Sequence, residues 1–280
     1  MTWCRKIDSM AHQARKRFGQ HFLVDQSIIA AIISRIRPHS LDRVLEIGPG
    51  LGAMTFSLID HLTTLDVVEL DRDLVTYWQA KEISKLQIYE ADALQFDFLD
   101  WANLAQHDFI VKNHAGRVKI VGNLPYNISS PLLFHLMLAI ESVDEQIFML
   151  QKEVVDRMVA QVGDSEYGRL SVMLGARYQI EHCFDVPPES FDPPPKVNSA
   201  IVAMYPKRGA GISAAVWSAM EILVAKAFAQ RRKVLANNLG DYKQILDLDG
   251  AILRARAQEI SIEQYLLWAE QIVDRSDTDK

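Results

Sequence analysis

Glu46-Ile47-Gly48-Pro49-Gly50-Leu51-Gly52 is a glycine-rich turn around which the rest of the chain can be interpreted. It follows a short apolar run that begins at Arg43, and residues 53–59 after it have helical character. Glycines at this spacing let the backbone approach a ligand closely beside the positive end of a helix. The pattern therefore predicts a strand, a ligand-binding turn and a helix, and the plain alternative is a tight strand-to-helix turn without a ligand.

The same alternation of strand and helix continues beyond this turn. Short apolar runs separated by helical segments predict a mostly parallel sheet covered on both faces, which is a Rossmann-like α/β fold. Residues 96–116 are expected to be irregular. The strands expected from the apolar runs are 43–47, 65–70, 86–89, 118–121, 146–150, 179–184 and 199–205.

Composition divides the chain into three predicted parts. Residues 1–24 are basic and lack clear periodicity, so we expect an amino-terminal arm. Residues 25–206 hold the α/β pattern, and Gly209 and Gly211 mark a boundary in the segment 206–213. Beyond that boundary only helical periodicity remains, which predicts a small all-α carboxyl-terminal domain over 207–280.

The overall composition predicts a globular protein of the cytoplasm. The 280 residues are 49% hydrophobic, which is typical of folded chains. The longest apolar stretches, such as 28–33, are far too short to span a bilayer, and the basic amino terminus has no apolar signal region. Cys4 and Cys183 are widely separated and lack zinc-ligand spacing, so we expect free thiols and no metal.

The net charge of −6 argues mildly against a nucleic-acid partner, but partners respond to local potential more than to the sum. Two basic clusters therefore count as candidate phosphate contacts, although each alone is more often a solvated face. The candidate nucleic-acid-binding residues are Arg15, Lys16, Arg17, Arg231, Arg232 and Lys233.

Two carboxylates extend the prediction from the glycine turn. Glu69 ends the next expected strand about twenty residues beyond Gly48, the separation at which a carboxylate grips ribose hydroxyls in related folds. Asp92 follows the third strand, where it can accept a hydrogen bond from an adenine amino group. Together with Gly48 and Gly50 they indicate an adenosine-bearing cofactor, either S-adenosylmethionine or a nucleotide.

The segment Asn123-Leu124-Pro125-Tyr126 follows an apolar strand and predicts the acceptor site. Pro125 biases Leu124 toward an extended conformation, so the Leu124 carbonyl and the Asn123 side-chain oxygen can receive both N–H bonds of a planar amine. Tyr126 supplies an aromatic face that can stack on the heteroaromatic base that carries this amine. A strand-ending turn is the plain alternative, because Asn and Pro are ordinary turn residues.

A second ring opposite Tyr126 would help hold an extruded base. Phe191, within the proline-rich segment 187–196, is our candidate. The alternative for Phe191 is a loop anchor packed into the core.

The chain resembles the ribosomal RNA adenine dimethyltransferases, specifically those that act on the bacterial small subunit. The resemblance covers nearly the whole chain, and several motifs in the same order carry it. They are Arg17–Leu23, Glu46–Gly52, Val68–Asp71, Ala91–Ala93, Gly122–Ser130, Phe148–Glu153, Tyr167–Ser171 and Phe191–Ser199.

The resemblance implies a class I S-adenosylmethionine-dependent methyltransferase with a small helical carboxyl-terminal domain. The implied reaction is dimethylation of two adjacent adenosines in the 3′-terminal hairpin loop of 16S rRNA, on a precursor of the 30S subunit, by a monomer without a metal. Two rival activities remain: a related methylase that modifies large-subunit rRNA, and a ribosome-assembly factor whose methyl transfer is secondary or lost.

Family roles carry over to the matching positions as expectations. The implied cofactor contacts are His21, Leu23, Gly48, Gly50, Glu69, Asp92 and Asn123. Many relatives carry Asn where this chain has His21, whose imidazole can also donate or accept a hydrogen bond. The implied catalytic segment is Asn123 to Tyr126.

Overall fold

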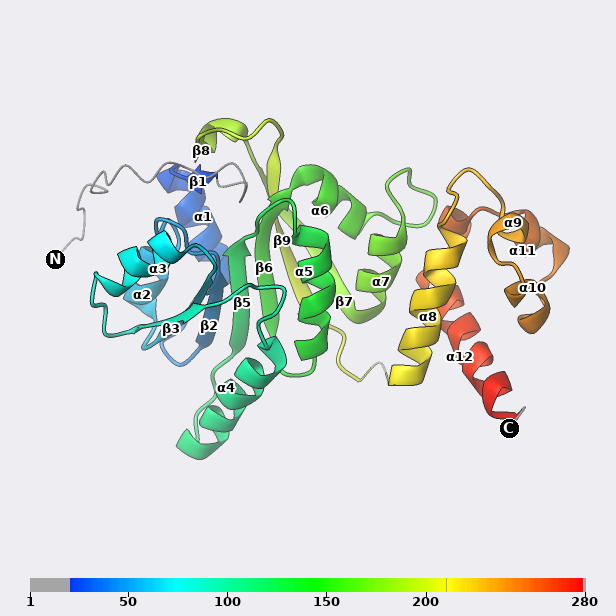
Figure 1. Ribbon diagram of the computed structural model, residues 1–280, viewed down its shortest axis with the longest axis horizontal. Coiled ribbons are helices and arrows are strands. Elements are labelled where there is room, and N and C mark those ends of the chain that lie inside the picture. Colours follow the sequence, from blue (N-terminus) through cyan, green and yellow to red (C-terminus); the bar gives the residue numbers. More distant parts are fainter. Residues whose placement is uncertain (1–20, 210, 279–280) are drawn as a thin grey trace.

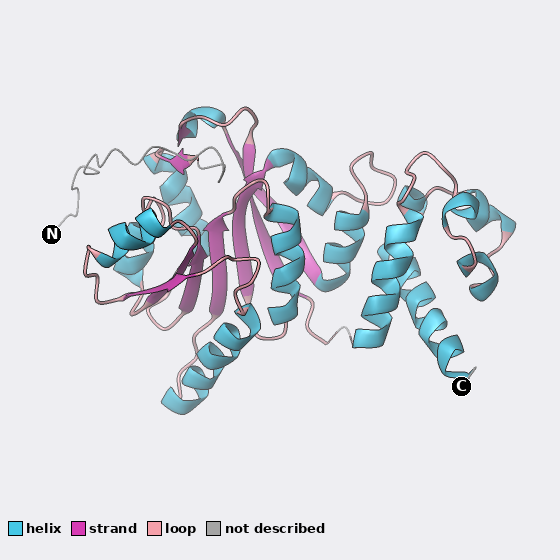
Figure 2. Cartoon of the chain, viewed as in Figure 1, coloured by secondary structure: helices cyan, strands magenta, loops and turns pink. Residues whose placement is uncertain are grey.

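The protein is described by a computed structural model that covers residues 21–209 and 211–278. Within that part of the chain, seven strands form one mixed sheet flanked by helices (Figures 1 and 2). The strands are β2 (Arg43–Ile47), β3 (Leu65–Glu69), β4 (Leu86–Glu90), β5 (Val118–Asn123), β6 (Glu145–Gln151), β7 (Tyr178–Val186) and β9 (Ser199–Pro206).

The order across the sheet is β4-β3-β2-β5-β6-β9-β7. Every pair from β4 to β6 is parallel, and only β9 runs antiparallel to its neighbours β6 and β7. The predicted mostly parallel α/β sheet is thus confirmed. Because chain order reverses direction between β2 and β5, their carboxyl ends flank the crevice in which open α/β sheets bind ligands.

Helices cover both faces of the sheet, and the two faces have separate cores. On one face, α1 (Gln26–Ile36) and α2 (Thr55–His61) pack on residues such as Val44 and Val121. On the other, α4 (Phe98–Lys112), α5 (Ser129–Leu136) and α6 (Lys152–Val159) pack on Leu45 and Ile120. Neighbouring residues of each strand thus enter opposite cores, as the pleat requires.

The first helix illustrates how local sequence sets these elements. The Asp25 side chain accepts hydrogen bonds from the backbone of Ser27 and Ile28, which caps the first turn of α1. Ile29, Ile32 and Ile36 recur at helical spacing and are buried, each stabilising the fold by about 1.5–3 kcal/mol.

Residues 96–116 contain a helix, α4, so the expectation of an irregular segment was wrong. Asp97 caps the helix through the Asp100 amide, and Phe98, Trp101, Ala102 and Ala105 are buried at helical spacing. Exposed apolar residues near the end, such as Ile110, blur that periodicity in the sequence. The buried side of the helix packs against β5 and the short turn Met137–Ala139, and this packing holds α4 in place although its exposed apolar residues obscure the amphipathic pattern.

The last residues of the predicted amino-terminal arm belong to the fold. Phe22 and Leu23 form β1, which pairs antiparallel with β8 (Phe191–Asp192) in a two-stranded sheet. The Val24 amide also donates to the Ser190 carbonyl. The proline-rich segment and the end of the arm are therefore held together beside the main sheet.

The carboxyl-terminal part is helical, as expected, in the residues described. Its helices are α8 (Ala214–Ala227), α9 (Leu235–Asn238), α10 (Tyr242–Ile245), α11 (Gly250–Arg254) and α12 (Ile262–Thr278). Their core includes Val172 and Met173 of α7 (Arg169–Arg177), so it continues across the predicted boundary at residue 206. The division into domains stays a prediction. In the described part of the chain no helix is long and apolar enough to cross a membrane.

Candidate active site

The glycine turn has the backbone conformation that its sequence predicts. Gly48, Gly50 and Gly52 have φ angles of +67°, +54° and +97°, which L side chains rarely adopt. At Gly52 a Cβ atom would lie 2.5 Å from a ring carbon of Phe56. The Trp78 indole N–H donates to the Gly50 carbonyl over 3.0 Å. The turn is therefore held close against α2 and α3 (Arg72–Gln79).

A cavity of about 1050 Å³ opens beside this turn, at the carboxyl ends of the parallel strands. It is large enough for a nucleoside-sized ligand. The predicted cofactor and acceptor residues from separate segments line this same cavity, which is the main point of agreement with the sequence. They are His21, Leu23, Gly48, Gly50, Glu69, Asp92, Asn123, Leu124, Pro125 and Tyr126.

Glu69 is the buried anion at the end of β3, with 7% of its surface exposed. Its Oε1 accepts hydrogen bonds from the Leu70 and Asp71 amides, both at 2.9 Å. Burial raises the pKa of Glu69, while backbone N–H groups of Asp71, Gly50 and Leu70 oppose that rise. A carboxylate fixed in this way can accept hydrogen bonds from a pair of hydroxyls, as predicted for the ribose.

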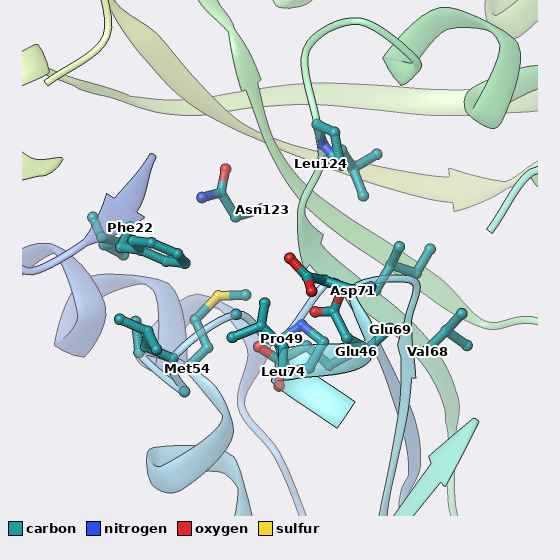
Figure 3. A pocket seen from close by; sticks show the side chains of 18 of the residues that line it. Phe22, Glu46, Pro49, Met54, Val68, Glu69, Asp71, Leu74, Asn123 and Leu124 are labelled. Carbon is teal, nitrogen blue, oxygen red and sulfur yellow. The ribbon is translucent and has the colours of Figure 1, made fainter. Parts of the chain in front are cut away.

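Glu46 lies in the same cavity but was not among the residues predicted for the site. It is 1% exposed, and its Oε2 accepts a hydrogen bond of 2.7 Å from the Thr55 hydroxyl. Burial raises the pKa of Glu46 to about 7, and the nearby Glu69 charge adds to the rise. A charged residue inside an otherwise apolar strand was the signal in the sequence. Figure 3 shows Glu46, Glu69 and Asp71 gathered on one side of the cavity.

Asp92 follows β4 and lines the cavity. Its Oδ1 accepts from the Leu94 amide at 2.9 Å, and its carbonyl accepts from the Gln95 and Phe96 amides. The turn is thereby fixed in position. The contact of Asp92 with an adenine amino group stays a prediction.

Asn123 is the last residue of β5, and in Figure 3 it lies on the other side of the cavity from Pro49 of the glycine turn. Its Nδ2 donates to the His21 carbonyl at 3.2 Å. Because the amide nitrogen is used in this way, the Oδ1 oxygen faces another direction and can serve as an acceptor. The Leu124 amide donates to the Met149 carbonyl of β6 at 3.1 Å, which anchors the turn to the sheet.

Tyr126 is partly buried at the edge of the cavity. Its hydroxyl lies 2.6 Å from Ser199 Oγ, and its ring stacks with the His21 imidazole. Burial raises the pKa of Tyr126, with the Ser199 hydrogen bond acting in the opposite direction. The phenol is thus held at its hydroxyl by Ser199, and the backbone at its other end follows directly after β5.

Phe191 does not line the cavity, in contrast to its predicted role as a stacking ring. Its side chain is 3% exposed and belongs to the core that includes Leu23 and Ile29. The β1–β8 pairing buries the ring as an anchor for the proline-rich segment. In this arrangement the ring offers no face to a base.

The structure describes only one of the two predicted basic clusters. Arg15, Lys16 and Arg17 lie outside the described residues. The Arg231 guanidinium donates to the carbonyls of Ser165 and Tyr167, the latter at 3.1 Å, so it ties down the loop before α7. The sequence predicted a phosphate contact for Arg231 and did not predict this structural role. Arg232 and Lys233 are exposed.

The residues present fit the adenosine cofactor expected from the sequence. Left-handed glycines leave room beside the turn, and a buried carboxylate stands at the end of the neighbouring strand. Phe22 packs 3.3 Å from the place a Cβ would take at Gly50, which closes one wall of the cavity. Among the described residues no cluster of three His, Cys, Asp or Glu side chains is arranged to hold a metal ion.

Known proteins resemble this chain over most of its length. The model of the family "Ribosomal RNA adenine dimethylase" matches residues 11–274. A "Ribosomal RNA small subunit methyltransferase A" of Bordetella petrii is 52% identical over 258 residues, covering 91% of this chain and 94% of that protein. Its counterpart in Cupriavidus taiwanensis is 47% identical over 275 residues, covering 95% of each.

Solved structures show the same fold at low sequence identity. A dimethyladenosine transferase from Plasmodium falciparum has a TM-score of 0.73 at 24% identity, covering 91% of this chain and 98% of that one. The 23S rRNA methyltransferase ErmE has a TM-score of 0.63 at 23% identity, covering 90% and 99%. The fold is that of class I S-adenosylmethionine-dependent methyltransferases, and the chain belongs to the ribosomal RNA adenine dimethylase family.

Proposed function

We propose that this enzyme dimethylates the N6 amines of two adjacent adenosines in the 3′-terminal hairpin loop of 16S rRNA. The substrate is a precursor of the 30S subunit, and the enzyme acts as a monomer in the cytoplasm. Relatives about 50% identical over more than 90% of the chain are small-subunit methyltransferases, which favours this substrate over large-subunit rRNA. The observation that carries the proposal is one cavity lined by both Glu69 and the Asn123–Tyr126 segment.

Bound S-adenosylmethionine supplies an electrophilic methyl group on its sulfonium sulfur. On the cofactor side, Glu69 holds the ribose hydroxyls and Asp92 holds the adenine amino group. Both residues line the cavity on the side of β3 and β4, whereas Asn123 reaches it from β5. The two reactants are therefore held in one crevice, and such positioning alone can lower a barrier by up to about 7–11 kcal/mol.

On the acceptor side, the Asn123 segment makes the amine nucleophilic. The lone pair of an adenine amino nitrogen is delocalised into the ring, which makes the nitrogen a poor nucleophile. When Asn123 Oδ1 and the Leu124 carbonyl accept its two N–H bonds, the lone pair is directed away from the ring plane, toward the methyl group. The positive charge that develops on the nitrogen is then met by fixed dipoles, which need no reorganisation during the reaction, and the nitrogen becomes neutral again by losing one N–H proton to water.

Fixed anchors support this role of Asn123. The side-chain nitrogen is bonded to the His21 carbonyl, and the following residue is bonded to β6. Tyr126 stacks on the extruded base, and its hydroxyl is held by Ser199. The acceptor groups are thus oriented before substrate arrives.

The test is transfer of labelled methyl groups to small subunits that lack these methylations. Asn123→Ala should lower kcat on the order of 10²–10³-fold, as when one preorganised polar group is removed from an active site. Asn237→Ala serves as the matched control, because Asn237 is exposed on α9, outside the residues that line the cavity. Equal activity of Asn123→Ala and wild type would refute the acceptor role.

Mapping the modified nucleotides tests the substrate separately. We expect two adjacent dimethylated adenosines in the 3′-terminal hairpin of 16S rRNA. Methylation of 23S rRNA instead would contradict the proposed substrate while leaving the reaction intact.

A further inference from the structure

Glu46 is a buried acid with apolar neighbours on both adjacent strands. In β2 it pairs with Val67 of β3 and Val121 of β5, and 1% of its surface is exposed. Its Oε2 accepts the hydrogen bond from the Thr55 hydroxyl, and its Oε1 accepts none from the described residues. The side chain nevertheless lines the cavity, as Figure 3 shows. One carboxyl oxygen is therefore left for a ligand in the cavity.

The surroundings of Glu46 favour its protonated form. Burial raises the pKa of Glu46 to about 7, the Thr55 hydrogen bond opposes this rise, and the like charge of Glu69 adds to it. Without a cation beside it, the carboxyl is therefore about half protonated at neutral pH.

Within the described residues, no other titratable side chain on the elements around Glu46 bonds to it. On α1 the charged residue is Arg35, which pairs with Glu145 and Glu181 instead. The other titratable groups on the helices, turns and segment 21–24 around it are His21, Asp60, His61 and Asp71. The described chain thus gives the carboxyl no cationic partner.

The cavity as a whole has the charge that suits a cation. Its two lysines are engaged elsewhere, because Lys85 Nζ donates to carbonyls at the end of α2 and the Lys81 ammonium lies 4.3 Å from the centroid of the Tyr77 ring. Five carboxylates line the same cavity, and they are Glu46, Asp60, Glu69, Asp71 and Asp92.

The cofactor changes its charge during the reaction at a single atom. S-adenosylmethionine carries a positive sulfonium, whereas S-adenosylhomocysteine, which remains after methyl transfer, has a neutral thioether. The two share the same adenosine and the same amino-acid end. A group that responds to the sulfonium therefore distinguishes the fresh cofactor from the spent one.

We propose that Glu46 is the counter-ion of the sulfonium, and that it releases a proton when S-adenosylmethionine binds and regains one after the methyl group has left. The inference rests on the proposed placement of the cofactor beside Glu69 and Asp92. A neighbouring positive charge favours the ionised form of a buried carboxyl, so the proton of Glu46 passes to water on binding.

Methyl transfer reverses this proton release. The sulfur keeps the electron pair of the broken S–C bond and becomes neutral, so the Glu46 carboxylate again lacks a positive neighbour and takes a proton from water. The site consequently binds the charged cofactor in preference to the neutral product, which favours their exchange after each transfer.

Glu46→Gln tests this role, because it keeps the size of the side chain and an oxygen for the Thr55 hydrogen bond but cannot ionise. The dissociation constants of S-adenosylmethionine and S-adenosylhomocysteine are measured by equilibrium dialysis without RNA, at about pH 6 and about pH 8. Because both ligands carry the same amino group, its titration cancels in their ratio. Glu90→Gln is the matched control, and thermal unfolding checks that each variant folds.

In wild type and in Glu90→Gln, the preference for S-adenosylmethionine over S-adenosylhomocysteine should rise about tenfold from pH 6 to pH 8, because a carboxyl with a pKa of about 7 must lose its proton to pair with the sulfonium. In Glu46→Gln the preference should not change with pH. Calorimetry at pH 7 in two buffers of different ionisation enthalpy should show that wild type releases about half a proton more than Glu46→Gln on binding S-adenosylmethionine.

The same pH dependence in wild type and Glu46→Gln would overturn the proposal, as would equal pH effects on the two ligands in wild type. Glu69→Gln separates this failure from a wrong placement of the cofactor. If Glu69→Gln weakens binding and Glu46→Gln does not alter its pH dependence, the counter-ion role alone fails. If neither substitution affects binding, the placement of the cofactor fails with it. These measurements use no RNA, so an error in the proposed rRNA substrate would leave their outcome unchanged.

Discussion

The buried Glu46 carboxyl makes the stability of this fold depend on pH in a way that one substitution removes. Glu46 is 1% exposed and is bonded to the Thr55 hydroxyl. Glu46→Gln keeps the size of the side chain and an oxygen that accepts the Thr55 hydrogen bond, but it cannot ionise. The variant therefore isolates the cost of charging this one group in the interior.

The magnitude follows from the pKa of Glu46, which burial raises from 4.5 to about 7 in the folded chain. A raised carboxyl pKa means that the folded state binds the proton more tightly than the unfolded state does. The resulting stability is fully present below about pH 4.5 and is lost as the pH rises through 7. At about 1.4 kcal/mol per pKa unit, wild type should lose about 2 kcal/mol relative to Glu46→Gln between about pH 5.5 and pH 8.

The assay is urea unfolding of both proteins at these two pH values. Comparison with Glu46→Gln cancels the other titrating groups, which are common to both chains. Glu90→Gln is the matched control, because the Glu90 side chain is half exposed and pairs with Arg72 at the surface. A difference between wild type and Glu46→Gln that stays constant from about pH 5.5 to pH 8 would refute an elevated pKa at Glu46.

Three further outcomes are expected. Glu69→Gln should weaken S-adenosylmethionine binding about 10–100-fold in equilibrium dialysis, because hydrogen bonds to a charged group are lost, whereas Glu90→Gln should leave it unchanged. Gly52→Ala should lower the free energy of unfolding in urea by about 2 kcal/mol more than Gly209→Ala does. Both glycines have left-handed backbones, but only at Gly52 would the added methyl group meet neighbouring side chains. Equal losses of stability in the two variants would contradict this steric account. Binding to precursor subunits should fall steeply with salt and Arg232→Ala should reduce the salt slope by about one, and binding that is insensitive to moderate salt would exclude the phosphate contacts.

The strand and helix pattern was largely predictable because it rests on local signals. Asp25 caps α1, left-handed glycines form the turn after β2, and short apolar runs form the parallel strands. The helix α4 was missed because several of its apolar residues face solvent, which obscures the periodicity on which such a prediction depends.

That the proposed cofactor and acceptor residues would lie together was also predictable. Parallel strands end on the same edge of a sheet, so polar residues that follow successive strands are brought into one crevice. Gly48, Glu69, Asp92 and Asn123 follow this rule and line one cavity. Their positions along the chain predicted that they would share one cavity, and their roles toward the cofactor and the target amine stay predictions.

The identity and orientation of the groups around that crevice depended on contacts between distant segments. Pairing of β1 with β8 buries Phe191, and the loop that follows turns His21 toward Tyr126. Glu46 acquires its raised pKa only when it is enclosed beside Glu69. The order of residues along the chain determines which strand each side chain follows. The exposure of a side chain, the orientation of an aromatic ring and the pKa of a carboxyl group depend on neighbours that are far apart in sequence, so only the folded chain determines them.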